Sequence, residues 1–145
     1  MDVSVDLSAE HKVPFAIIYA ESITEEVQNA IDFLSSDNNA PITAQHQYKT
    51  VILQPTDIFM VRIENGETII YDKHNKYFSR KRLYELQNKL GRMFMQISKS
   101  VIVNLKQLDS VEAGFNGTML LKLKNGCNDY VSRKYLPDFK KYLGM

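Results

Sequence analysis

The chain has 145 residues, and its 18 Lys and Arg residues nearly balance 17 Asp and Glu residues, which leaves a formal net charge of +1. A hydrophobic content of 44% is enough to build a core and excludes disorder throughout, and the single cysteine, Cys127, excludes an intramolecular disulfide framework. The longest apolar stretch, residues 13–20, is far shorter than the roughly 20 residues that span a membrane, and we expect a soluble, cytoplasmic protein.

The first segment, residues 1–40, is predicted to hold a strand and a helix. Residues 13–20 form a continuous apolar run with β-branched and aromatic members, which is typical of a buried strand. Turn-forming residues at 35–41 predict a linker, after which a second domain spans residues 41–145. Because the first segment is too short to hold a core alone, we expect it to pack on the second domain or on a second copy of the chain.

The helix of this first segment has a start signal and an apolar face. Ser22 and Glu25 have the spacing of a capping box, in which the two side chains satisfy free backbone groups at the helix start. Val27, Ile31 and Leu34 follow at a spacing that places them on one face of the helix.

The second segment is predicted to be mostly strands joined by tight turns. Asn-Gly pairs accept the positive φ angles of hairpin turns, and they occur at 65–66, 116–117 and 125–126. A fourth turn is predicted at 73–76. In residues 120–124, leucines alternate with Lys122 and Lys124, which predicts a strand with its lysines facing solvent.

Two helices are predicted among these strands. Ser79 can cap a helix over residues 80–90, which Gly91 would end. Ser132 can cap the last helix of the chain, but Pro137 then lies too deep in it, so the regular part is also compatible with a start near Pro137.

Signs of catalysis or of metal binding are absent from the sequence. His11, His46 and His74 lie far apart and show no ligand spacing with each other or with Cys127. No glycine-rich phosphate loop and no nucleophile elbow is present. We therefore expect a protein that is not an enzyme, with no metal, no cofactor and no small-molecule substrate.

Charge is distributed unevenly along the chain. Residues 1–72 carry 3 basic and 12 acidic residues, whereas residues 73–145 carry 15 basic and 5 acidic residues. A basic half is typical of a polyanion binder, because each Lys or Arg placed on a phosphate releases counterions. Pairing of the two halves across the fold would give the same pattern, so charge alone leaves both interpretations open.

Two short segments carry the strongest functional signal. Residues 94–104 read FMQISKSVIVN, residues 131–135 read VSRKY, and Phe115, Asn116 and Gly117 lie between them. Their order and spacing resemble the LytTR family of bacterial DNA-binding domains, whose signature is roughly F-x-R-x-H-R-S-Y-I-V-N, a turn like this one, and a Val-Ser-Arg triplet. The resemblance covers about residues 42–143. It implies a mostly β (α+β) fold of antiparallel sheets and hairpins with short helices, which reads the major groove of double-stranded DNA with loop residues.

The resemblance also implies which side chains contact DNA. Lys99 and Arg133 are the candidate base readers, and Asn116 is a candidate at the intervening turn. Phosphate or positioning contacts are implied for Ser98, Ser100 and Lys134. The family's usual His-Arg pair is Ser98-Lys99 here, and lysine lacks the planar fork that grips guanine.

Each base-reading candidate has an alternative explanation. Lys99 could instead be a solvated loop lysine, and Asn116 is half explained by turn chemistry. Arg133 could instead pair with Asp129 or Glu112 across the hairpin. Asn104, although within the motif, is expected to hold the loop by hydrogen bonds to the backbone.

A bacterial transcriptional regulator without a receiver domain is the protein class that the resemblance implies. Members of that class are often found beside a membrane-protein inhibitor, so residues 1–40 are a candidate surface for homodimerisation or for such an inhibitor. The alternative function is a non-enzymatic β domain whose basic face binds RNA or an acidic protein partner. The sequence shows no clustered aromatic motif for stacking on unpaired bases.

Overall fold

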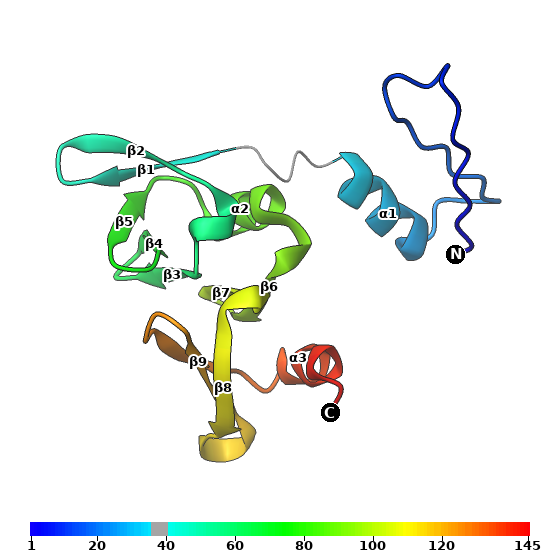
Figure 1. Ribbon diagram of the computed structural model, residues 1–145. Helices are drawn as coiled ribbons and strands as arrows, with labels where there is room; N and C mark the ends of the chain where they lie inside the picture. The colour runs from blue at the N-terminus through cyan, green and yellow to red at the C-terminus, as the bar shows by residue number, and fades with distance from the viewer. Residues whose placement is uncertain (36–40) are drawn as a thin grey trace. The chain divides into compact units, whose positions relative to one another are not determined.

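The computed structural model describes residues 1–35 and 41–145 and divides the chain into two compact units (Figure 1). The N-terminal unit comprises residues 1–36 and the C-terminal unit residues 37–145. The predicted linker at 35–41 and the predicted boundary after residue 40 fall on or beside residues outside the described ranges.

The helix α1 (Glu25–Ser35) of the N-terminal unit forms as predicted but starts from a different cap. The Oγ1 atom of Thr24 accepts a hydrogen bond from the backbone N of Val27 at 3.3 Å. The N-cap is thus Thr24, directly before the first helical residue, and the expectation that Ser22 caps the helix is wrong. Glu25 and Glu26 lie in the first turn, where carboxylates are favoured by the helix dipole.

The strand predicted at residues 13–20 is not formed. These residues have no regular secondary structure, and Val13, Phe15, Ile17 and Tyr19 are between 63% and 91% exposed. A strand needs a neighbouring strand to satisfy its backbone groups, and none of the described residues of this unit supplies one. The apolar run therefore stays extended and largely open to solvent.

The C-terminal unit is built from two antiparallel sheets and confirms the predicted mostly β fold. Seven strands form the first sheet in the order β2-β1-β5-β4-β3-β7-β6, and three form the second in the order β10-β9-β8. The strands are β1 (Ile42–His46), β2 (Lys49–Leu53), β3 (Met60–Glu64), β4 (Glu67–Tyr71), β5 (Lys76–Ser79), β6 (Phe94–Ser98), β7 (Val101–Asn104), β8 (Leu108–Ala113), β9 (Met119–Leu123) and β10 (Asn128–Val131). In this order β2 lies at one edge of the seven-stranded sheet and β6 at the other.

The Asn-Gly turns join neighbouring strands as predicted. Asn65 and Gly66 connect β3 to β4 with φ angles of 51° and 78°, the positive values that a two-residue hairpin needs. Asn116 and Gly117 connect β8 to β9 with φ angles of 53° and 78°. Between β9 and β10 only the glycine of the third pair, Gly126, has a positive φ.

The predicted fourth turn connects β4 to β5 and is organised by Asp72. The Oδ1 atom of Asp72 accepts hydrogen bonds from the backbone N of His74 and of Asn75, and its Oδ2 accepts one from the hydroxyl of Tyr77. Burial by itself raises the pKa of Asp72, but these hydrogen bonds outweigh it and lower the pKa.

The helix α2 (Leu83–Leu90) begins later than predicted. Ser79 is the last residue of β5 and is buried, and its hydroxyl accepts a hydrogen bond from the backbone N of Lys81 instead of capping the helix. At the helix start, the carboxylate of Glu85 accepts one from the backbone N of Arg82. Gly91 ends the helix with a φ of 77°, as predicted.

The last helix, α3 (Leu136–Leu143), starts at Leu136 and carries Pro137 in its first turn. Proline is tolerated there because its missing N–H has no partner at a helix start. Ser132 does not cap the helix. Its carbonyl instead accepts hydrogen bonds from the backbone N of Tyr135 and of Leu136, which forms an irregular turn before the helix. The structure thus follows the later of the two starts compatible with the sequence.

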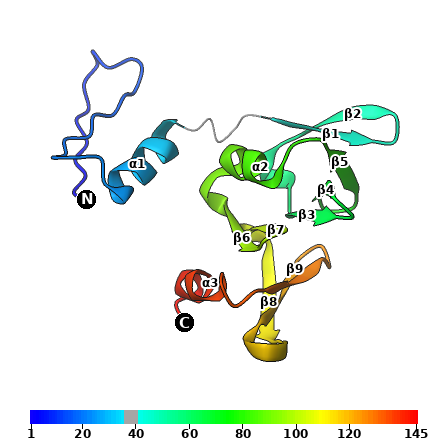
Figure 2. The same ribbon diagram turned by 180° about the vertical axis from the view of Figure 1, so that it is seen from behind.

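Two hydrophobic clusters lie on opposite faces of the seven-stranded sheet, and the second covers the part of its face formed by β3, β4, β6 and β7. On one face, α2 packs with Leu86 and Leu90, whereas this part of the other face is covered by the three-stranded sheet and α3 (Figure 2). The strand β7 shows the alternation directly, since Ile102 belongs to the first cluster and Val101 and Val103 to the second. Both faces of β7 are therefore buried, which holds this strand rigidly.

The alternation predicted for β9 is confirmed. Leu121 and Leu123 are buried, whereas Lys122 and Lys124 are exposed. None of the helices in the described residues combines the length and the apolar character that a membrane span requires.

Candidate nucleic-acid interface

Lys99 occupies a tight turn between β6 and β7 that is held from two sides. Within the turn, the Oγ of Ser98 accepts a hydrogen bond from the backbone N of Ser100 at 3.3 Å. The carbonyl of Ser100 accepts one from the backbone N of Ile63 in β3 at 2.8 Å. Lys99 itself is exposed, so a rigid turn presents a cationic side chain to solvent.

Asn104 supports this region from within the sheet. It is 1% exposed, its Nδ2 donates to the carbonyl of Ile58 at 2.8 Å, and its Oδ1 accepts from the backbone N of Lys106 at 3.0 Å. Its predicted role in holding the backbone is confirmed. Because its side chain is buried and both ends of its amide bond to the backbone, Asn104 is unsuited to contact a ligand.

Arg133 lies against the Asn116–Gly117 turn. A Cβ atom at Gly117 would lie 3.4 Å from the Cδ of Arg133, so the stem of the arginine passes directly over this glycine. Both Asn116 and Arg133 are exposed. The turn between β8 and β9 and the loop after β10 therefore form one surface.

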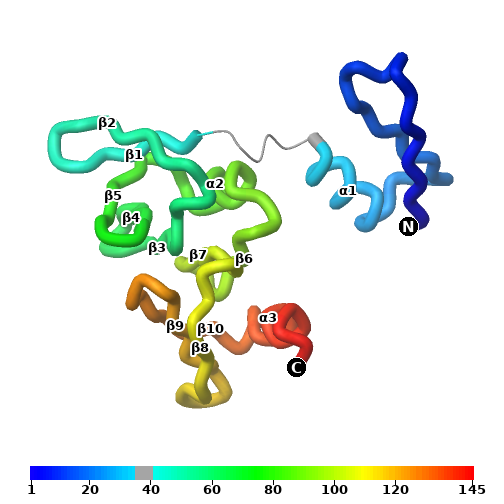
Figure 3. The backbone as a smooth tube through the Cα atoms, viewed as in Figure 1, coloured from blue at the N-terminus to red at the C-terminus, as the bar shows by residue number. Residues whose placement is uncertain are grey.

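A backbone hydrogen bond joins this surface to the Lys99 turn. The N–H of Ser132 donates to the carbonyl of Ile97 in β6 at 2.9 Å. Ser132 precedes Arg133, and Ile97 lies two residues before Lys99. The structure therefore brings the loops of both candidate base readers side by side, and Figure 3 traces the two backbone segments.

Neither Lys99 nor Arg133 has a hydrogen bond or an ion pair with any residue that the structure describes. The partners that Arg133 could have used are engaged elsewhere. Asp129 pairs with Arg62 at 3.2 Å, and Glu112 pairs with Lys122 at 4.0 Å. The alternative explanation for Arg133, internal pairing across the hairpin, is therefore wrong.

The remaining sequence candidates lie around these two loops. Lys134 is exposed, and its Nζ lies 5.6 Å from the ring centroid of Tyr135. Ser98 and Ser100 belong to the Lys99 turn itself. Phe115 is not among the contacts that the sequence predicts, yet it is 81% exposed beside Asn116. Exposure of a phenylalanine at the tip of a short loop is the signal for an apolar contact, and it is visible only in the structure.

A cluster of charged and hydroxyl groups lies between the two sheets. The guanidinium of Arg62 in β3 contacts Asp129 of β10 at 3.2 Å, Glu64 at 2.9 Å and the hydroxyl of Tyr71 at 3.1 Å. The hydroxyl of Tyr71 also donates to Glu64 at 2.8 Å. Burial favours a lower pKa for Arg62, but its bonds to Tyr71, Asp129 and Glu64 raise that pKa above its usual value. The arginine therefore stays charged.

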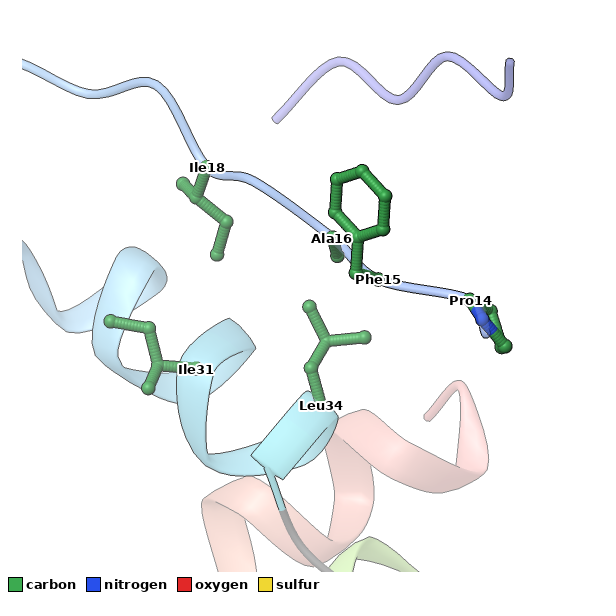
Figure 4. Close-up of a pocket in the computed structure, with 6 residues that line it drawn as sticks. All are labelled: Pro14, Phe15, Ala16, Ile18, Ile31 and Leu34. Atoms are coloured by element: carbon green, nitrogen blue, oxygen red, sulfur yellow. The ribbon is translucent and has the colours of Figure 1, made fainter. Parts of the chain in front are cut away.

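The N-terminal unit contains an apolar cavity between α1 and the extended segment before it (Figure 4). Leu34 of α1 points toward that segment. Six residues line the cavity: Pro14, Phe15, Ala16, Ile18, Ile31 and Leu34. Its apolar lining has no charged group, so it offers packing surface and no site for chemistry.

The chain is similar to known proteins in sequence and in fold. The family model for the LytTr DNA-binding domain matches residues 48–144. Two uncharacterized HTH-type transcriptional regulators of Staphylococcus aureus, from strains MSSA476 and MW2, are each 25% identical over 146 residues, and the matches cover 100% of this chain and 99% of theirs. A solved LytTr DNA-binding domain of a response regulator from Bacillus cereus is similar in fold, with a TM-score of 0.68 and 20% identity over 73% of this chain and 98% of that one.

Proposed function

The chain belongs to the LytTR family of DNA-binding domains, which act in transcription regulation, and from this premise we propose that Lys99 and Arg133 read base edges in the major groove of double-stranded DNA. The observation that carries the proposal is the hydrogen bond from Ser132 to Ile97, which keeps the two loops adjacent. Both side chains are exposed and unpaired among the described residues, so neither has to break an internal contact to reach DNA.

Loops are better placed for this task than helices. In the described part of the C-terminal unit, five strands separate α2 from α3, so these two helices are not consecutive as a helix-turn-helix would require. The apolar face of α2 packs on the sheet, and Phe139 anchors α3 in the core. The Lys99 turn and the Arg133 loop, in contrast, are exposed and are held next to each other by the hydrogen bond from Ser132 to Ile97.

Four further residues complete the proposed interface. Asn116, beside Arg133, contacts a base or the backbone from the turn between β8 and β9. Ser98, Ser100 and Lys134 contact phosphates or position the two loops. The hydroxyl of Ser98 is already used within its turn, which supports a positioning role for this serine.

The test is a binding comparison between a cognate and a random duplex. The cognate duplex is selected from a random pool with the full chain, and fluorescence anisotropy measures both affinities at one fixed salt concentration. Arg133→Ala is expected to weaken binding to the cognate duplex by about 1–3 kcal/mol. It should also reduce the difference between the affinities for the cognate and the random duplex. Lys122→Ala is the matched control, since it also removes one exposed positive charge but lies on the outer face of β9.

Two results would contradict the proposal. One is an unchanged ratio of cognate to random affinity in Arg133→Ala. The other is tighter binding to single-stranded RNA than to duplex DNA at the same salt concentration, which would favour the RNA-binding alternative. With duplex DNA, log affinity is expected to fall with log salt by about 0.9 for each phosphate neutralised.

The N-terminal unit is proposed to mediate homodimerisation. Its exposed apolar residues and its apolar cavity support a contact with another protein surface. Sedimentation velocity on the full chain is expected to show a dimer that Leu34→Glu dissociates and that Gln28→Glu, the same charge change on the same helix, leaves intact. A dimer that survives Leu34→Glu would leave this surface for a membrane-protein inhibitor instead. A DNA-binding role also supports a cytoplasmic location.

A further inference from the structure

The two proposed base readers are attached to different sheets. Lys99 follows β6 of the seven-stranded sheet, whereas Arg133 follows β10 of the three-stranded sheet. DNA presents its base edges at fixed spacings, so side chains from two bodies can read it together only if the bodies keep a constant relative position. The contacts between the two sheets therefore bear directly on the proposed function, on which this inference rests.

Three polar contacts pin the region of β10 to the seven-stranded sheet. Before the strand, the Nδ2 of Asn125 donates to the carbonyl of Asp72 at 2.8 Å. After it, Ser132 donates to Ile97 through the backbone. Between them, Asp129 accepts from the Nη1 of Arg62 at 3.2 Å. Among these three contacts, the central one alone is an ion pair between two side chains.

The ion pair lies close to both proposed readers along the chain. Arg62 is paired across the β3–β7 ladder with Val101, two residues after Lys99. Asp129 precedes Arg133 by four residues. The pair is also shielded, with side-chain exposures of 27% for Arg62 and 24% for Asp129, so solvent weakens it less than it weakens a surface pair.

We propose that the Arg62–Asp129 ion pair is a positioning contact that fixes the three-stranded sheet on the seven-stranded sheet and thereby sets the spacing between the Arg133 loop and the Lys99 turn. Two features favour this role over simple stabilisation. The Nε of Arg62 is buried and lacks a hydrogen-bond partner among the described residues, which is costly. Apolar side chains of similar size often stabilise a core as well as a buried pair does, but without its directional geometry.

Asp129→Ala is the sharpest variant, because it removes the contact between the sheets and leaves Arg62 bound to Glu64 and Tyr71. Glu64→Ala is the matched control. It removes the same charge from the same cluster and breaks a shorter bond to Arg62, yet Glu64 and Arg62 both belong to β3, so the link between the sheets remains. Asp129→Glu keeps the carboxylate and serves as the rescue.

The measurement is the ratio of cognate to random duplex affinity, with the melting temperature of each variant recorded alongside. Asp129→Ala is expected to lower the ratio about tenfold, which corresponds to about 1.4 kcal/mol, with little change in random-duplex affinity. Glu64→Ala should keep the ratio even if it melts at a lower temperature, and Asp129→Glu should recover most of it. If Asp129→Ala fails to fold, Asp129→Asn, which preserves size, takes its place.

Two outcomes overturn the proposal, and they separate it from the proposed function. If Asp129→Ala keeps the ratio while Arg133→Ala loses it, base reading stands and the positioning role falls. If Glu64→Ala lowers the ratio as much as Asp129→Ala does, the cluster acts through stability alone. An unchanged ratio in Arg133→Ala contradicts the proposed function itself and removes the basis of this inference as well.

Discussion

The two units of this chain treat their apolar residues in opposite ways. In the C-terminal unit, two clusters bury one face of the seven-stranded sheet and the part of its other face formed by β3, β4, β6 and β7, and residues such as Ile102 and Phe139 are fully buried. In the described part of the N-terminal unit, Val27 is the single buried hydrophobic residue, while Phe15 and Tyr19 lie open to solvent. Hydrophobic content alone therefore does not produce a core. Strands that pair and stack bury their apolar faces, and a short helix with an extended segment cannot.

The largest expected difference between the two units is in the loss of unfolding free energy when one apolar side chain is truncated in each. Phe139→Ala is expected to lower the free energy of unfolding by about 3–5 kcal/mol, because a fully buried ring leaves a cavity. Leu34→Ala, at a residue 56% exposed in the single chain, is expected to change the unfolding free energy of the monomer by less than about 0.5 kcal/mol. Urea unfolding at a protein concentration at which the proposed dimer dissociates measures both losses. A loss in Leu34→Ala as large as that in Phe139→Ala would show that the monomer itself covers this face of α1.

Within the C-terminal unit, a buried and an exposed asparagine are expected to differ in their contribution to unfolding free energy. Asn104→Ala should cost about 1–3 kcal/mol, because the carbonyl of Ile58 and the backbone N of Lys106 would be left without their partner. Asn128→Ala, at an exposed position of β10, is the control and should stay within about 0.5 kcal/mol. Equal losses of unfolding free energy in chemical denaturation would contradict the role of Asn104 in holding the backbone through buried hydrogen bonds.

A smaller change in unfolding free energy is expected at low pH, where the carboxylate of Asp72 becomes protonated. Hydrogen bonds lower the pKa of Asp72 in the folded chain, so the charged carboxylate contributes stability above its unfolded pKa of about 4. That contribution is lost as the pH falls through the lower folded pKa. Asp72→Asn should therefore show a flatter decline of unfolding free energy as the pH falls below about 4. Thermal melts over this range measure it, and parallel curves would contradict the assignment.

Local signals predicted the turns and the solvent face of the sheet. Asn65-Gly66 adopts the positive φ angles that its residue types favour, and the leucines of β9 alternate with its lysines as their spacing requires. These features depend on neighbours in the sequence. Ser22 and Ser79 failed as caps because several residues near a helix start can accept the same hydrogen bond, and packing decides among them.

Features that depend on distant parts of the chain were not predictable from the residues. The apolar run at 13–20 has the composition of a strand, but a strand forms only where a neighbour exists. The candidate residues Lys99 and Arg133 came from the family resemblance, whereas the bond between Ser132 and Ile97 that places them together depends on the packing of two sheets. The Arg62–Asp129 pair joins residues 67 positions apart, and neither side chain stood out in the sequence as a partner of the other.

The edge position of β2 has a consequence for how molecules of this protein meet one another. In the described residues β2 pairs with β1 on one side, and its other side presents free backbone donors and acceptors to solvent. A free sheet edge of this kind can pair with a strand from another molecule, and repeated pairing extends the sheet. Lys49, exposed at the start of β2, opposes that addition by charge repulsion between approaching edges. An exposed lysine at this free edge thus favours separate molecules over association from sheet to sheet.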